Sequence, residues 1–212
     1  MVDAKIIRDF FHLLNKENLN YVLIKNDGGV IPEKIHNGDD VDILIHPCDY
    51  ERFAKVMEQA GYSRLAGESK KYFFVYKMKP DIFLQKEDAF FHAYDKLSCV
   101  SFTNMGRSKL PLDNFIQEYI WKNKKWDSIN NWWIMNDKVI LLYLIIRSVL
   151  DKQEFRIKYI QEIEKRSHLL DDDEFLTMCR LVFFNFTDLL IKKIKSFEYN
   201  DIVYNYQRFK DY

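Results

Sequence analysis

The chain has 212 residues and a mass of 25.7 kDa, with 32 lysine and arginine residues against 32 aspartate and glutamate residues. This zero net charge argues against a protein that coats nucleic acid or binds anionic lipid, because both depend on an excess of cations. A hydrophobic content of 48% with 30% charged residues is typical of a folded globular protein and excludes wholesale disorder. Only six glycines and four prolines supply turns, so we expect helices to predominate over a many-stranded sandwich or barrel.

Cysteine usage and hydropathy indicate the compartment. The cysteines Cys48, Cys99 and Cys179 are far apart and form no CxxC motif, which favours a reducing environment. The most apolar run covers only residues 139–146, whereas a membrane span needs about 20 residues. Residues 1–14 lack the apolar core of a signal peptide. We therefore expect a cytoplasmic protein with no membrane span.

The first half of the chain mixes predicted helices and strands. Helical spacing of apolar residues predicts two helices, over residues 3–16 and 48–60, and Gly61 is placed to end the second. Asn26-Asp27-Gly28-Gly29 reads as a turn. Short apolar runs predict strands at 21–25, 39–46, 72–78, 81–85 and 97–102.

From about residue 112 the pattern becomes helical. Apolar and amphipathic segments predict helices at 112–126, 136–150, 155–170 and 172–197. The acidic run 171–174 favours a helix N-terminus. The expected fold class is α+β, with an α/β domain at 1–111 and a C-terminal helical bundle at 112–212.

The most informative chemical feature is the acidic start of the strand at 39–46. Because side chains alternate along a strand, Asp40 and Asp42 project to one side while Val41 and Ile43 project to the other. Two such carboxylates repel each other, and a divalent cation is the usual compensation. Oxygen ligands on a rigid strand suit Mg²⁺. The alternative is a solvent-facing strand end rich in acids.

A third acid, Asp81, opens the apolar segment 81–84. A strand that is apolar on both sides has little reason to begin with aspartate unless the carboxylate points into a polar site. The alternative is a turn residue that follows Pro80.

Together, these features resemble the nucleotidyltransferase-fold superfamily, whose pattern is a glycine turn after a first strand, an acidic strand about ten residues later, and then another acid-containing strand. The residues that carry the resemblance are Gly28-Gly29, Asp40-Val41-Asp42-Ile43 and Asp81-Ile82-Phe83. Within the superfamily, the stretch from YVLIKNDGG to HPCDYERF is most similar to small proteins of bacterial polysaccharide and lipopolysaccharide gene regions. It also resembles the LicD and fukutin group. The resemblance covers roughly residues 1–90 and implies a mixed sheet flanked by helices.

The resemblance implies a Mg²⁺-dependent nucleotidyltransferase, or a related phosphotransferase. The nucleotidyltransferase would move a nucleotidyl group from an NTP, such as ATP, to a small acceptor, for instance a sugar intermediate of cell-surface polysaccharide synthesis. Asp40 and Asp42 would hold the ion on the triphosphate, and Asp81 would bind a second ion or act as base toward the acceptor hydroxyl. The backbone N–H groups of Gly28 and Gly29 would contact phosphate, although a plain turn fits them as well.

Two lysines are further candidate contacts to the nucleotide. Lys25 ends the first strand beside the expected site, where it fits a strand terminus equally well. Lys152 lies in the basic stretch 147–158 and forms an i,i+4 pair with Arg156 on one helix face. The alternative is a solvated charged face.

Two other functions stay open: a catalytically inactive binding module of the same fold, and a toxin- or antitoxin-type nucleotidyltransferase that acts on tRNA or protein. The neutral net charge argues mildly against nucleic acid. No zinc site is expected, because no HxxxH or HExxH spacing joins the histidines His12, His36, His92 and His168.

Overall fold

The structure, a computed structural model, describes residues 1–24, 26, 29–65, 78–103 and 106–209. The strand predicted at 72–78 falls outside these residues except for Met78, and so do two predicted phosphate contacts, Lys25 and Gly28.

The chain folds into two compact units whose segments interleave along the sequence. The first unit comprises Met1–Leu97 and Trp121–Met135, and the second Ser98–Ile120 and Asn136–Tyr212. The sequence led us to expect a single boundary between residues 111 and 112. The division into domains at 1–111 and 112–212 stays a prediction.

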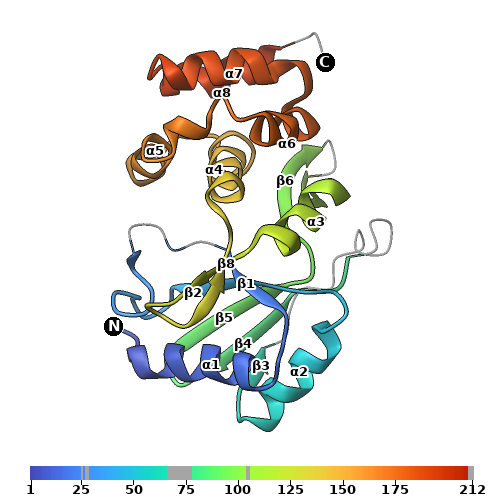
Figure 1. Cartoon of the computed structure of the whole chain (residues 1–212), viewed down its shortest axis with the longest axis vertical. Coiled ribbons are helices and arrows are strands. Elements are labelled where there is room, and N and C mark those ends of the chain that lie inside the picture. Colours follow the sequence, from blue (N-terminus) through green and yellow to red (C-terminus); the bar gives the residue numbers. More distant parts are fainter. Residues whose placement is uncertain (25, 27–28, 66–77, 104–105, 210–212) are drawn as a thin grey trace. The chain divides into compact units, whose positions relative to one another are not determined.

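The first unit contains a seven-stranded sheet with the order β3-β4-β5-β2-β1-β9-β8 (Figure 1). Its strands are β1 (Tyr21–Leu23), β2 (Asp40–Ile45), β3 (Ser63–Leu65), β4 (Ile82–Lys86), β5 (Ala89–Tyr94), β8 (Lys125–Asp127) and β9 (Trp132–Ile134). The β2–β5 and β1–β9 pairs are parallel and the other neighbours antiparallel, so the sheet is mixed, as the resemblance implied.

Helices α1 (Ala4–Lys16) and α2 (Tyr50–Gln59) pack on one face of this sheet. Phe10 of α1 stacks on Phe91 of β5, with 3.9 Å between ring centroids. The inward side chains of β2, Val41, Ile43 and Ile45, belong to the same buried cluster. Burial of this apolar surface is the main stabilising contribution in the unit. Because residues alternate, the opposite face of β2 carries the acids.

Both predicted N-terminal helices are confirmed, and their ends follow from local chemistry. The side chain of Asp3 caps α1 by accepting from the Lys5 N–H at 2.8 Å. Gly61 lies just after α2 with φ of +81°, the left-handed conformation that glycine adopts without steric cost.

The second unit contains the hairpin β6 (Ser98–Thr103) and β7 (Gly106–Pro111) together with helices. Its helices are α3 (Asn114–Asn123), whose last three residues belong to the first unit, α4 (Asp137–Ile146), a π-helical segment (Arg147–Lys152), α5 (Ile157–Glu164), α6 (Asp173–Phe183), α7 (Thr187–Lys195) and α8 (Tyr199–Arg208). Short 3-10 helices cover Ser167–Leu169 and Phe184–Phe186. Asp172 of the acidic run caps α6 by accepting from the Phe175 N–H at 3.0 Å.

Several predicted helices are too long. The helix predicted at 112–126 ends at Asn123, and Lys125–Asp127 forms β8 instead. The helix predicted at 172–197 is divided at Phe184, where φ is +49°. The helix α8 was not predicted. Runs of apolar residues do not reveal breaks that the backbone makes within one or two residues.

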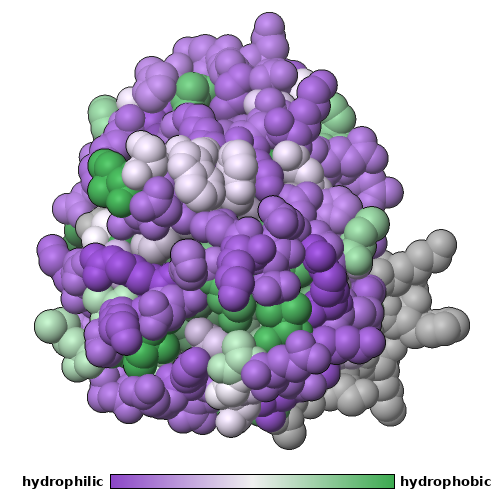
Figure 2. Space-filling model, turned by 60° about the horizontal axis from the view of Figure 1, so that its bottom comes forward, coloured by the Kyte–Doolittle hydropathy of each residue, from purple (hydrophilic) through white to green (hydrophobic). Residues whose placement is uncertain are grey.

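None of the helices that the structure describes combines the length and the apolarity that a bilayer crossing requires. The face drawn in Figure 2 is mostly hydrophilic, with hydrophobic side chains visible between polar ones.

Candidate active site

The register of β2 against β5 brings the acidic strand beside a histidine. In this parallel pair Asp40 lies opposite Phe90 and Asp42 lies opposite His92. Side chains alternate between the two faces along each strand, and paired residues of neighbouring strands point to the same face. Asp40, Asp42 and His92 therefore project from one face of the sheet, away from α1 and α2.

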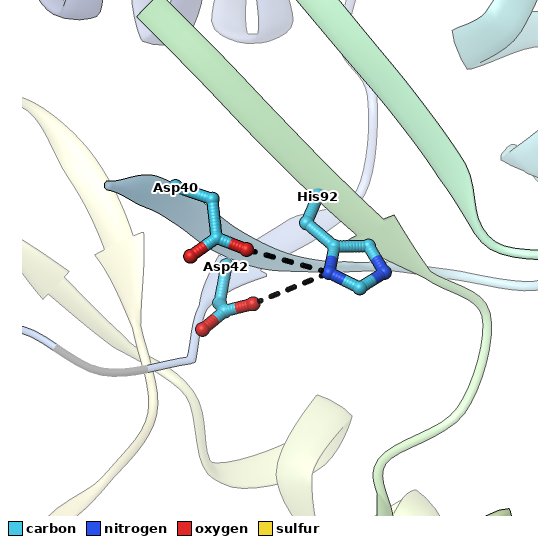
Figure 3. Close-up of side chains that lie close together, drawn as sticks. All are labelled: Asp40, Asp42 and His92. Atoms are coloured by element: carbon cyan, nitrogen blue, oxygen red, sulfur yellow. Dashed lines mark ion pairs between the residues drawn. The ribbon is translucent and has the colours of Figure 1, made fainter. Parts of the chain in front are cut away.

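The three side chains converge (Figure 3). Nδ1 of His92 lies 3.5 Å from Oδ2 of Asp40 and 3.7 Å from Oδ1 of Asp42. The Asp42 residue is only 7% exposed, whereas 49% of the Asp40 side chain is exposed. The site therefore has one enclosed and one accessible carboxylate.

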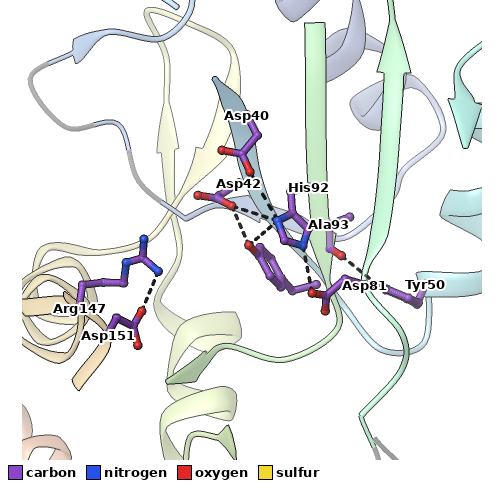
Figure 4. Close-up of polar contacts among 9 residues, drawn as sticks. Asp40, Asp42, Tyr50, Asp81, His92, Ala93, Arg147 and Asp151 are labelled. Carbon is purple, nitrogen blue, oxygen red and sulfur yellow. Dashed lines mark hydrogen bonds and ion pairs between the residues drawn. The ribbon is translucent and has the colours of Figure 1, made fainter. Parts of the chain in front are cut away.

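Asp81 contacts the other edge of the same ring (Figure 4). Its Oδ2 lies 3.0 Å from Nε2 of His92, and its side chain is only 7% exposed. The imidazole thus stands between Asp81 and the pair formed by Asp40 and Asp42. The structure brings together Asp40 and Asp42, as the sequence predicted, and it connects Asp81 to them through His92.

Two aromatic side chains fix the imidazole. Phe83 of β4 stacks on the ring of His92, with 3.8 Å between centroids and an interplanar angle of 29°. The Tyr94 hydroxyl donates to Oδ1 of Asp42 at 2.8 Å and lies 2.7 Å from Nδ1 of His92. Contacts on the face and on both nitrogens restrict the ring to one orientation.

The electrostatics of the cluster favour a cation. Burial lowers the pKa of His92, but hydrogen bonds to Asp40 and Asp81 and the charge of Asp42 outweigh it, so this pKa lies above its ordinary value of 6.5. A positive charge is therefore stabilised at this position, whether a proton or an ion supplies it.

The donor atoms also fit a single metal ion. The ligand atoms of Asp40, Asp42 and His92 all lie within 4.8 Å of one another. Two ligands bound to one ion at about 2.1 Å lie about 3.0 Å apart at right angles and about 4.2 Å apart on opposite sides. The separations of 3.5 and 3.7 Å fall within that range.

Of the predicted glycine turn, Gly29 is described. Its φ is +67°, and a side chain added there would meet no atom within 4 Å. Its N–H donates to the carbonyl of Asn26 at 3.1 Å. The Asn26 amide in turn contacts both backbone groups of Ile31, which closes the loop. The predicted contact of this turn with phosphate stays a prediction.

Lys152 belongs to the second unit, at the end of the π-helical segment. The predicted i,i+4 pair with Arg156 on one helix face is wrong, because Gln153 has φ of +54° and Arg156 begins α5 as its N-cap. The contact of Lys152 with a nucleotide stays a prediction.

Sequence reasoning assigned no role to His92, because its partners lie far away in the chain. The strand that contains it was also missed. A period-two pattern was nevertheless present, since Phe90, His92 and Tyr94 alternate with the buried residues Ala89, Phe91 and Ala93.

No known family profile matches the chain, and no curated protein matches its sequence. Solved structures do match its fold. The solution structure of the antibiotic-resistance factor ANT(2'')-Ia has a TM-score of 0.50 at 8% identity, over 92% of this chain and 94% of that chain.

Two other solved structures match with lower TM-scores. A crystal structure of ANT(2'')-Ia in complex with adenylyl-2''-tobramycin has a TM-score of 0.49 at 8% identity, over 93% of this chain and 99% of that chain. The lincosamide antibiotic adenylyltransferase LnuA bound to lincomycin has a TM-score of 0.46 at 12% identity, over 77% of this chain and 98% of that chain.

At these identities the likeness concerns the fold. The comparisons give no support to the narrower likeness to the LicD and fukutin group. The α+β class, the mixed sheet flanked by helices and the C-terminal helices are as predicted, and the chain has a nucleotidyltransferase fold.

Proposed function

We propose that this protein is a metal-dependent nucleotidyltransferase that moves a nucleotidyl group from an NTP to a hydroxyl group of a small acceptor. The observation that carries the proposal is the convergence of Asp40 and Asp42, with His92, on the face of the mixed sheet opposite α1 and α2. A likeness in fold supports it, because one protein with a similar fold is the antibiotic-resistance factor ANT(2'')-Ia, which has also been crystallised with adenylyl-2''-tobramycin.

In the reaction, the hydroxyl oxygen of the acceptor attacks the α-phosphorus of the NTP. The bond from that phosphorus to the bridging oxygen breaks, and pyrophosphate leaves with the electron pair. Asp40 and Asp42 would hold the divalent ion, Mg²⁺ in the sequence-based prediction, and this ion would neutralise the charge on the phosphates.

The proton of the acceptor hydroxyl needs a base. Asp81 was predicted to bind a second ion or to act as this base, and its carboxylate is enclosed and lies against Nε2 of His92. We propose instead that the carboxylate oxygen of Asp40 that does not bind the ion accepts the proton, because about half of this side chain is accessible to an incoming hydroxyl. Gly28, Gly29, Lys25 and Lys152 remain proposed contacts to the phosphates.

The acceptor is proposed by chemical class only. Both a sugar intermediate of polysaccharide synthesis and an aminoglycoside carry the required hydroxyl groups, and ANT(2'')-Ia has been crystallised with adenylyl-2''-tobramycin. The comparisons give no support to the polysaccharide intermediate, so antibiotics take first place in the panel. A cytoplasmic location, where NTPs are present, fits this reaction and the three free cysteines.

The test is to incubate the protein with Mg²⁺ or Mn²⁺, each α-labelled NTP and a panel of aminoglycosides, lincosamides, sugars and sugar phosphates. Pyrophosphate release and the mass of the labelled product are measured. Asp40→Asn should abolish product, whereas the matched control Asp39→Asn, which removes the same charge from the neighbouring exposed residue, should retain it.

Equal product from Asp40→Asn and the unaltered protein would refute the proposed site. NTP binding without any transfer, across the whole panel and with protein and tRNA added, would favour the inactive binding module.

A further inference from the structure

His92 holds a position that is more constrained than that of an ordinary buried histidine. It lies on β5 directly opposite Asp42 of β2, and only 9% of it is exposed. Phe83 covers one face of the ring, and Tyr94 lies at its Nδ1 edge. The ring therefore presents one nitrogen to the pair of carboxylates and the other nitrogen to Asp81.

These two nitrogens have different partners. Nδ1 lies 2.7 Å from the Tyr94 hydroxyl oxygen, and it also faces Oδ2 of Asp40 and Oδ1 of Asp42, at 3.5 and 3.7 Å. Nε2 faces Oδ2 of Asp81 at 3.0 Å. Histidines that bind metals typically donate the N–H of their second nitrogen to a carboxylate, which sets the tautomer and orients the ring. The arrangement in Figure 4 matches this pattern, with Asp81 as the orienting carboxylate.

We infer that His92, through Nδ1, is the third protein ligand of the metal ion held by Asp40 and Asp42, and that Asp81 is a positioning residue that acts through the imidazole. The inference rests on the proposed function for the metal site. It changes the ligand set from three carboxylates to two carboxylates and one imidazole.

The altered ligand set changes which ion the site prefers. Mg²⁺ binds carboxylate and water oxygens, whereas an imidazole nitrogen suits transition-metal ions such as Mn²⁺ and Zn²⁺. With His92 the ion would have three protein ligands instead of the two carboxylates of Asp40 and Asp42 alone. Metal binding would therefore depend less on oxygens from the nucleotide phosphates. We therefore expect Mn²⁺ to bind without nucleotide, and to bind more tightly than Mg²⁺.

The experiment is pulsed electron paramagnetic resonance of Mn²⁺ bound to the full chain without nucleotide, paired with calorimetric titrations of Mn²⁺ and Mg²⁺. A coordinated histidine nitrogen should modulate the Mn²⁺ echo, and ¹⁵N-labelled histidine should alter that modulation. With Zn²⁺ in place of Mn²⁺, ¹⁵N NMR should identify Nδ1 as the bound nitrogen. These measurements on the unaltered protein need no variant to fold.

Variants then separate the two roles. His92→Asp should lose the nitrogen modulation and shift the preference between Mn²⁺ and Mg²⁺ toward Mg²⁺ by about tenfold, because a carboxylate replaces the imidazole. Asp81→Asn should keep the modulation but weaken Mn²⁺ binding by about tenfold, as expected when an orienting partner is lost. His12→Asn, which replaces an exposed histidine on α1, is the matched control and should change neither value.

The outcomes distinguish this inference from the proposed function. Mn²⁺ binding that needs Asp40 and Asp42 but shows no histidine nitrogen would overturn the role of His92 and leave the nucleotidyltransferase proposal intact. Binding that persists in the Asp40→Asn, Asp42→Asn double variant would overturn both. No binding at millimolar Mn²⁺ without nucleotide would overturn the role of His92 alone, because the proposed reaction needs the ion only together with the NTP phosphates.

Discussion

Two buried aspartates, one in each unit, are equally enclosed and have different surroundings. Asp42 and Asp151 are each 7% exposed. Asp151 binds the Arg147 guanidinium at 2.7 Å and accepts from the Val100 N–H at 2.8 Å (Figure 4). Asp42 accepts from the Tyr94 hydroxyl and lies beside a histidine and a second carboxylate.

The different surroundings indicate that Asp151 has a structural role and that Asp42 is a candidate ligand for a cation. A guanidinium is permanently charged and cannot be displaced without leaving a buried carboxylate uncompensated. Burial lowers the pKa of Arg147, but its interactions with Tyr143 and Asp151 raise it above its ordinary value, so the guanidinium stays charged. An imidazole, by contrast, can exchange its proton for a metal ion. Two aspartates with the same exposed fraction therefore have different roles. Asp151 forms a permanent buried ion pair, whereas Asp42 lies beside a group that can be replaced by a metal ion.

The largest expected effect is a loss of catalytic activity on substitution of Asp42. Asp42→Asn should lower kcat by about 10³-fold or more, because a metal ligand supplies several kcal/mol of transition-state stabilisation and about 1.4 kcal/mol corresponds to a factor of ten. The free energy of unfolding should change by less than about 1 kcal/mol, because asparagine still accepts from Tyr94. Steady-state kinetics and urea unfolding measure the two quantities. A variant that loses stability together with activity would make Asp42 a structural acid like Asp151.

The second effect tests the structural acid. Arg147→Met should lower the free energy of unfolding by about 3–5 kcal/mol, because it leaves Asp151 buried without its guanidinium. Arg156→Met is the matched control, since its pair with Glu154 is exposed and 3.7 Å long, and it should cost less than about 1 kcal/mol. Equal losses in the two variants, measured by urea unfolding, would show that burial of the pair is unimportant.

The smallest expected effect is on how the free energy of unfolding depends on pH. A group whose pKa is raised in the folded state stabilises that state fully below its unfolded pKa, which is about 6.5 for histidine. This contribution is lost as pH rises through the folded pKa. The raised pKa of His92 therefore predicts that, with a chelator present, stability declines as pH rises above about 6.5.

His92→Asn should flatten this decline, whereas the exposed-histidine control His12→Asn should retain it. Urea unfolding at a series of pH values measures both slopes. An unchanged slope in His92→Asn would show that the decline comes from other groups.

Much of the first unit could be predicted from local patterns. The helix at 3–16, the strand at 39–46 and the helix at 48–60 are confirmed within a few residues, because each has a clear period and a recognisable end. The strands β8 and β9 could not be found in this way. Each has three residues, which is too short for a period of two to be visible.

The site was predictable in part for a different reason. Asp40 and Asp42 share a face because they are two residues apart, and this follows from strand geometry alone. The approach of His92 depends on pairing between strands about 50 residues apart, and its register is not encoded in either strand by itself.

A count of charges along the chain does not by itself reveal which acids are paired in the fold. Residues 27–51 contain seven acids against one base. Three of these acids pair with bases that lie outside the stretch: Glu33 with Arg8, Asp49 with Arg52 and Glu51 with Lys79.

The interleaving of the two units has a consequence for dissecting the protein. The chain passes from one unit to the other after Leu97, Ile120 and Met135. Any fragment that ends at residue 111 lacks β9, and the edge of β1 that pairs with it at Leu23 and Ile134 would be left open to self-association. A protease would have to cut three times to release the sheet unit, and a single nick would leave each unit tethered to the other.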